Sequence, residues 1–152
     1  MASGWTNKGK YKVLGWALRA ETPPGHLYIV LCTSAHAPDA DHSPFSGLTE
    51  IADGDGYTTG GYELHRDSTD FDTWTQTDGS DIAFVQLKDL TWVASGGAIP
   101  VSGDGARWAV LTDDNATLNS REVYAYFDLV SDRSVSSGQS LTLQDTELRL
   151  TE

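Results

Sequence analysis

The sequence predicts an all-β protein, an antiparallel β-sandwich of jelly-roll-like type with one short N-terminal α-helix. Apolar and polar side chains alternate with period two in several short segments, as in strands with two distinct faces. Clusters of Gly, Ser, Asp and Asn separate these segments at intervals of about 8–12 residues, and the chain has 15 glycines. We therefore expect about seven or eight strands in a single domain, residues 1–152.

The N-terminal residues 5–20 show helical rather than strand spacing. Their apolar side chains recur every three or four positions and predict an amphipathic helix, with the lysines on its wetter side; these apolar residues are Tyr11, Leu14, Ala17 and Leu18. Gly9 and Gly15 weaken this helix by about 1 kcal/mol each if they are interior. Pro23 and Pro24 end it.

The middle of the chain alternates between apolar runs and polar excursions. Residues 26–33 predict a central strand, and residues 34–47 form a polar loop long enough to serve as a contact loop. Glycines between positions 53 and 64 indicate tight turns around a short strand. Residues 67–81 form a polar excursion anchored by Phe71 and Trp74. Residues 82–93 predict a strand with a kink near position 89.

Residues 105–129 predict a hairpin at the centre of the fold. Ala109 and Leu111 face one side and Trp108 the other, and in the second strand Tyr124 and Tyr126 share a face. Both faces carry large apolar side chains, so we expect this hairpin in the middle of the sandwich or in a subunit contact. A turn follows at 131–133, then strands at 141–143 and 146–150, with Leu148 and Leu150 facing inward.

Charge is divided unevenly along the chain. The first 19 residues hold four cations and no acid, which gives them a charge of +4. The net charge of the whole chain is −12, so the other residues together carry −16. The acidic body argues against a nucleic-acid partner. Residues 5–20 become a candidate docking segment for a capsid or subunit contact, through Trp5, Lys8, Lys10, Tyr11, Lys12, Trp16 and Arg19. The alternative is a soluble surface kept apart by self-repulsion.

The sequence offers little support for catalysis or a cofactor. Asp53 and Asp55 resemble the start of a calcium loop, but the later ligand positions hold Tyr57 and Leu64, so a looser Ca²⁺ site is the most that remains open. The four histidines lack metal-binding motifs; these are His26, His36, His42 and His65, of which His36 and His42 share a loop with Asp39 and Asp41.

Acid pairs such as Asp70 and Asp72 lie in a turn-rich segment and do not predict a glycosidase. No nucleophile motif is present, so we expect no enzyme and no cofactor. Cys32 is the only cysteine, so it cannot form a disulfide within the chain. Because it lies in an apolar run, we expect a buried and unreactive thiol. We expect neither a membrane-spanning segment nor a secretory signal.

Aromatic residues are the other candidate contact groups. Those we single out for packing or interfaces are Trp74, Trp108, Tyr124 and Tyr126. Trp74, between Asp and Thr residues, also fits a sugar-stacking platform.

Several motifs, taken in order, resemble small virion structural proteins of tailed bacteriophages. They are GWTNKGKY (4–11), LYIVLCTSAHAPDAD (27–41), LTEIADGDGYTTGGYEL (48–64), ARWAVLTDDNAT (106–117) and REVYAYFDLVSDRSVSSGQSLTL (121–143). The resemblance implies a β-sandwich present in many copies on a virion assembled in the host cytoplasm. It implies a capsid decoration, or cement, protein on the outer head surface. Its partner would be the major capsid protein or another virion protein, and it would form a homo-oligomer, with a trimer favoured. The alternatives are a tail or baseplate component, or a carbohydrate-binding module contacting host glycans.

Overall fold

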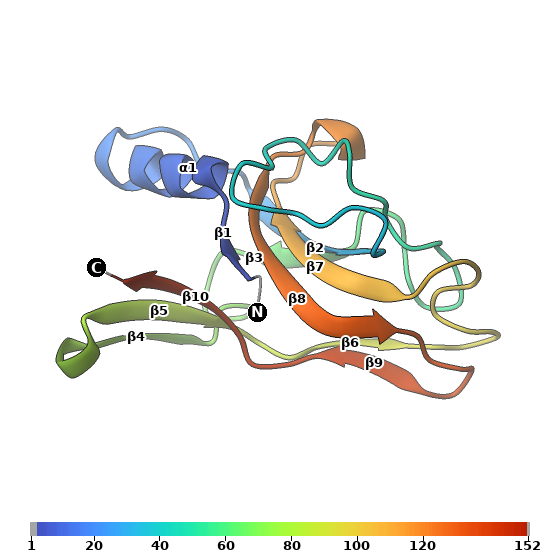
Figure 1. The fold of residues 1–152 in the computed structure, drawn as a ribbon. Helices are drawn as coiled ribbons and strands as arrows, with labels where there is room; N and C mark the ends of the chain where they lie inside the picture. Colours follow the sequence, from blue (N-terminus) through green and yellow to red (C-terminus); the bar gives the residue numbers. More distant parts are fainter. Residues whose placement is uncertain (1–2, 152) are drawn as a thin grey trace.

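A computed structural model of the protein describes residues 3–151 (Figure 1). The helical and strand elements follow one another as β1 (Gly4–Trp5), α1 (Asn7–Leu18), β2 (His26–Cys32), β3 (Tyr62–His65), β4 (Thr73–Thr77), β5 (Ile82–Leu87), β6 (Leu90–Val93), β7 (Ala106–Thr112), β8 (Val123–Arg133), β9 (Ser140–Leu143) and β10 (Thr146–Thr151). Two 3₁₀ turns, Asp78–Ser80 and Leu118–Ser120, complete the regular structure of these residues. The all-β expectation with one short helix is confirmed.

Three antiparallel sheets make two layers. The larger layer is a five-stranded sheet in the order β1-β8-β7-β2-β3. The second layer contains β10-β5-β4 and β6-β9, and it runs beneath the first as a long twisted ribbon (Figure 1). Lys88 and Asp89 separate β5 from β6, as the kink near position 89 predicted, and Gln144 and Asp145 separate β9 from β10. Both strands of the ribbon therefore break at the same level.

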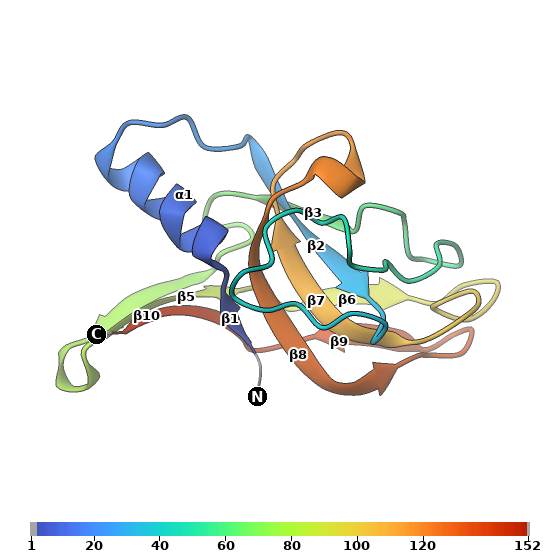
Figure 2. The same cartoon turned by 45° about the horizontal axis from the view of Figure 1, so that its top comes forward.

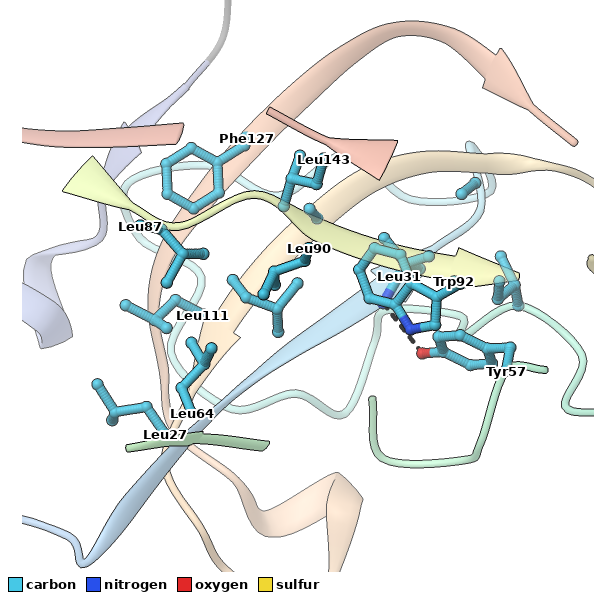
Figure 3. Close-up of a cluster of buried hydrophobic side chains, with 14 of the residues drawn as sticks. Leu27, Leu31, Tyr57, Leu64, Leu87, Leu90, Trp92, Leu111, Phe127 and Leu143 are labelled. Carbon is cyan, nitrogen blue, oxygen red and sulfur yellow. Dashed lines mark hydrogen bonds between the residues drawn. The ribbon is translucent and has the colours of Figure 1, made fainter. Parts of the chain in front are cut away.

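The main core lies between the two layers. Ile29, Leu31 and Leu111 point down from the five-stranded sheet, and Leu90 and Trp92 rise from the ribbon. Figure 3 shows this cluster, with the Tyr57 hydroxyl accepting a hydrogen bond from the Leu31 backbone N–H at 3.1 Å. Each fully buried aliphatic or aromatic side chain contributes about 1.5–3 kcal/mol. Ala109, Leu111 and Leu148, which the alternation in the sequence assigned to a shared or inward face, belong to this cluster.

A second, smaller core covers the opposite face of the five-stranded sheet. Phe45 and Leu48, from the loop after β2, pack there on Val30, Val110 and Trp108. The loop is fixed by backbone hydrogen bonds, including Thr33 N–H to Thr49 O at 2.8 Å. It crosses the face of β7 and β8 in both views (Figure 1 and Figure 2). Thus the chain's own loop explains why both faces of the central hairpin are apolar.

A register shift changes the expected pattern of the hairpin. β7 and β8 pair regularly from Trp108↔Asp128 to Leu111↔Ala125, and then Thr112 pairs with Val123. The shift turns Tyr124 towards the main core, whereas Tyr126 stays on the other face beside Trp108. The prediction that Tyr124 and Tyr126 share a face was therefore wrong, because a bulge is invisible in a simple alternation.

Four other expectations are corrected. Strand β4 lies within the segment expected to be a polar excursion, and β8 continues through 131–133, where a turn was expected. Leu150 is exposed, although Leu148 is buried as predicted. The helix spans Asn7–Leu18 instead of 5–20, because Gly4–Trp5 pair with β8 as a strand. Within residues 3–151, helix α1 is too short and too polar to cross a membrane.

Candidate functional site

The start of α1 is tied to the sandwich by its capping residue. Thr6 is buried, and its hydroxyl accepts a hydrogen bond from Gly9 N–H at 2.9 Å and donates one to Val123 O at 2.6 Å. A threonine N-cap satisfies one of the free N–H groups of the first helical turn. The Trp5 indole N–H donates to Arg149 O in β10 at 2.9 Å. The helix therefore begins at a fixed point between β8 and β10.

Glycines form the buried face of α1. Gly9 and Gly15 are its buried residues, and Gly9 approaches the backbone of Tyr124 in β8 so closely that no side chain fits between them. Trp16 packs edge-on against the Tyr124 ring, with centroids 5.4 Å apart. The expectation that the regularly spaced apolar residues form the inward face was wrong. The side chains turned outward include Tyr11, Leu14, Ala17 and Leu18.

The outward face of α1 exposes three large apolar side chains to solvent. Tyr11, Leu14 and Leu18 keep 61, 57 and 75% of their surface in contact with solvent. They lie at positions i, i+3 and i+7, so they form one stripe along the helix. We call these three residues the helix stripe.

The cations of α1 divide into two groups. Lys8 and Lys12 pair with Glu122, the residue before β8, at 3.2 and 3.8 Å, and Lys12 also reaches Glu21 at 3.8 Å. These two lysines hold the helix on its own sandwich. Lys10 and Arg19 are exposed. The uneven charge of the sequence is thus partly neutralised within the chain, and half of the basic residues face outward.

A groove of about 780 Å³ separates α1 from the β10-β5-β4 sheet. Both elements project to the same side of the molecule (Figure 1 and Figure 2). Trp5 and Trp16 line one wall, and Phe71 and Trp74 line the other. Trp74 is 87% exposed, the largest exposure among the large hydrophobic residues of 3–151. Arg66 lies at the rim, with its guanidinium carbon 5.5 Å from the Trp16 ring centroid. The residues of the helix stripe do not line this groove; we call the groove and the helix stripe, taken together as two separate parts, the candidate docking surface.

The structure sorts the predicted contact residues into three places. Trp5, Trp16, Trp74 and Tyr124 line the groove together. Lys8, Lys10, Tyr11, Lys12 and Arg19 lie on α1 or at its C-terminal end, away from the groove lining. Trp108 and Tyr126 pack on each other in the second core, with ring centroids 6.3 Å apart and Trp108 only 6% exposed.

Sequence reasoning missed Phe71, Val85 and Arg66 as groove residues. The sequence identified Phe71 only as an anchor of a polar segment. For Val85, the alternation of residues 82–87 was the available signal, because it places Val85 on one defined face of the strand.

The four histidines lie in two different parts of the fold. His36 is exposed, His42 lies beside Gly47, and the two do not form a ligand cluster with Asp39 and Asp41. In the part of the chain that the structure describes, the group of three or more potential ligands that comes together is His26, Glu63 and His65.

The Asp53–Asp55 segment is a tight turn closed by hydrogen bonds between Gly54 and Tyr57, at 2.8 and 3.1 Å. The carboxylate of Asp55 packs against Gly97. Neither aspartate belongs to a cluster of three ligands within residues 3–151. The local hydrogen bonds account for this segment as a turn.

The pair Asp70 and Asp72 occupies two different environments. Asp70 is buried, forms an ion pair with Lys88, and receives a 2.6 Å hydrogen bond from His65 N–H. Burial raises the pKa of Asp70, but hydrogen bonds from Lys88 and His65 outweigh it and hold the pKa below its ordinary value. Asp72 is exposed at the groove. The two carboxylates therefore do not face each other across a cleft, as paired glycosidase acids do.

Comparisons of the chain with protein-family models, with curated protein sequences and with solved structures found no match. The resemblance to virion proteins of tailed phages thus stays a prediction that depends on the motifs of this sequence.

Proposed function

We propose that this protein is a structural component of a tailed-phage virion, and that it serves as a capsid decoration protein that binds and stabilises the outer head surface. Its partner is the major capsid protein or another virion protein, and the protein acts there as a homo-oligomer, with a trimer favoured. The observation that carries the proposal is the candidate docking surface, where the helix stripe and Trp74 leave large apolar side chains in solvent.

The three apolar side chains of the helix stripe lie side by side in solvent, and such side chains favour association. Isolated exposed apolar residues are normal on proteins, but contiguous patches usually mark interaction sites. Here Leu14 and Leu18 stand on a helix whose buried residues are Gly9 and Gly15, and both leucine side chains face solvent although Trp16 packs on Tyr124. Trp74 is a second exposed apolar side chain, and it lines the groove instead of the stripe. Tryptophan and tyrosine are also the residue types enriched in protein–protein contacts.

Charge supports a partner with an acidic surface. Lys10 and Arg19 point outward on the same helix, while Lys8 and Lys12 are already paired with acids of this chain. Oriented charges at an interface guide association and select the partner more than they add affinity. The acidic body of a second copy, or an acidic shell protein, suits this arrangement.

The experiment is a co-sedimentation assay with particles of a phage that encodes this chain. The test variant carries Leu14→Ser and Leu18→Ser. The matched control carries Val93→Ser and Val101→Ser, two exposed valines at the end of β6 and in the segment between β6 and β7, outside α1 and the groove. Burying two leucine side chains contributes about 3 kcal/mol, so particle affinity should fall by about a hundredfold in the test variant alone. Equal binding by both variants would refute docking through the helix.

A carbohydrate-binding module, or a tail or baseplate component contacting host glycans, is the second candidate. The observation in its favour is the exposed indole of Trp74 in a strand of polar residues, beside Asp72 and Gln76. Size-exclusion chromatography with light scattering separates the candidates. A stable trimer supports the virion role, whereas a monomer retained on a glycan column, with retention lost in Trp74→Ala, supports the module.

A further inference from the structure

Two histidines and a glutamate share the outer face of the β2–β3 pair. His26 of β2 stands directly opposite His65 of β3 in the antiparallel register, and Glu63 precedes His65 by two residues. Alternate residues of a strand point to the same face, so the three side chains leave the sheet together. Their neighbours Leu27 and Leu64 point the other way, into the main core. The register therefore gathers metal-ligand side chains from distant parts of the chain.

The three side chains are close enough for one ion. One potential ligand atom from each lies within 4.8 Å of the other two, and His26 Nε2 is 3.8 Å from Glu63 Oε1. Around a tetrahedral ion with bonds near 2 Å, ligand atoms stand about 3.3 Å apart. The side chains are roughly half exposed, at 43% for His26, 48% for Glu63 and 56% for His65. A small rotation of the half-exposed His26 side chain therefore closes the gap to Glu63.

A buried carboxylate holds His65 in the orientation that metal binding needs. Asp70 Oδ2 lies 3.0 Å from His65 Nδ1, and the Asp70 side chain is only 2% exposed and paired with Lys88. A carboxylate that accepts the Nδ1 proton of a histidine leaves Nε2 with its lone pair free and fixes the ring. This carboxylate–histidine arrangement is common behind metal-bound histidines. Asp70 is therefore a positioning residue for His65.

Glu63 is oriented in a similar way. The Tyr28 hydroxyl donates to Glu63 Oε2 at 2.5 Å, which leaves Oε1 turned towards His26. The guanidinium of Arg121 lies 4.1 Å from the centre of the Tyr28 ring and supports the tyrosine from behind. Asp114 accepts the His26 backbone N–H at 3.1 Å and adds a second carboxylate beside the cluster. Glu63 and Asp114 thus place two carboxylates beside His26.

We propose that His26, Glu63 and His65 bind a divalent transition-metal ion of the zinc class. Two imidazoles and one carboxylate form a donor set that suits Zn²⁺, and imidazole selects Zn²⁺, Ni²⁺ or Cu²⁺ over the oxygen-seeking Ca²⁺ and Mg²⁺. The remaining coordination positions face solvent, where water or a side chain of a neighbouring molecule completes the shell. The site lies on the β2–β3 pair and does not depend on the docking proposal.

The first test is a Zn²⁺ titration of the untagged protein by isothermal calorimetry at neutral pH. We expect saturable binding of one equivalent and a rise in melting temperature with Zn²⁺. His26→Ala and His65→Ala, which change exposed side chains, should lose both effects while keeping the circular dichroism spectrum of the parent. His36→Ala, which removes an exposed histidine outside the cluster, is the matched control and should bind like the parent.

The second test concerns Asp70. Asp70→Asn should weaken Zn²⁺ binding by about 10–100-fold, as changes behind a metal-bound histidine do. Histidine ¹⁵N spectra provide a readout that altered stability does not imitate, since metal-bound His65 should carry its proton on Nδ1. The proposal is overturned if the parent binds no stoichiometric Zn²⁺, or if His26→Ala and His65→Ala bind as the parent does. In that case the cluster is an ion pair of His26 and Glu63 only.

Discussion

Replacing Gly9 by alanine reverses the usual effect of this substitution in a helix. In a solvent-exposed helix interior, alanine is more favourable than glycine by about 1 kcal/mol. Gly9, however, lies against β8. A Cβ at this position would stand 2.8 Å from the carbonyl carbon and 2.9 Å from the Cα of Tyr124, and would overlap the carbonyl oxygen. Carbon atoms in contact prefer about 3.5–4.0 Å, so α1 has to move away by about 1 Å.

The displacement weakens several contacts at once. Thr6 loses its fit between Val123 and Gly9, and Trp16 loses its edge-on packing with Tyr124. Forcing one extra methyl group into a close-packed contact costs about 1–3 kcal/mol, and more where backbone is the obstacle. After subtraction of the gain in helix propensity, we expect a net destabilisation of about 2 kcal/mol. For a domain of this size the melting temperature then falls by roughly 4–8 °C.

Urea denaturation followed by tryptophan fluorescence measures this change, with two glycine controls. Gly15→Ala meets only the carboxylate end of Glu21, at 2.9 Å, and this flexible side chain can move aside. We therefore expect Gly15→Ala to be neutral or stabilising by up to about 1 kcal/mol. Gly79→Ala meets no atom within 4 Å and should leave stability nearly unchanged. A Gly9→Ala protein as stable as Gly15→Ala would refute the close approach of α1 to β8.

Three further predictions concern single side chains. Trp108 is buried, so Trp108→Ala should lower the free energy of unfolding by about 3–5 kcal/mol. Trp74 is in solvent, so Trp74→Ala should change the free energy of unfolding by no more than about 0.5 kcal/mol. Similar urea midpoints for the two variants would contradict these positions. The pKa of Asp70 in the folded protein lies below its ordinary value, because hydrogen bonds from Lys88 and His65 outweigh the effect of burial. The ionised Asp70 therefore stabilises the folded state above about pH 4, and this contribution is lost as the pH falls through the folded-state pKa. The difference in unfolding free energy between the parent and Asp70→Asn should accordingly shrink from pH 7 to pH 3, and a constant difference would count against the ion pair. Burial raises the pKa of the Cys32 thiol, so a thiol reagent should label the protein only after unfolding, and rapid labelling of the native protein would disprove this burial.

The strands were largely predictable because their signal is local. Alternation in 106–112 assigned Ala109 and Leu111 to one face and Trp108 to the other, and both cores follow that assignment. The kink near position 89 was also visible, because Lys88 and Asp89 interrupt an apolar run. Strand β4 was missed because its residues, TWTQT, are polar at its edge position and resemble a loop.

The candidate sites depend on contacts that no local pattern encodes. The apolar residues of α1 are spaced as a buried face would be, yet glycine lets the backbone of β8 approach on the other side and turns the helix stripe outward. Likewise His26 and His65 become neighbours only through the register of β2 and β3, whereas the nearby pair His36 and His42 stays in a loop.

By itself, the sequence determined the all-β class, the residues of the core strands, the short N-terminal helix and the basic charge of that helix. These properties follow from side-chain periodicity and composition, which act over a few residues. Only the tertiary structure decided which face of α1 is free, that five aromatic residues line one groove, and that Asp70 supports His65 beneath the histidine cluster. Such features arise from packing and strand register between distant segments, and those are set by the fit of the whole chain.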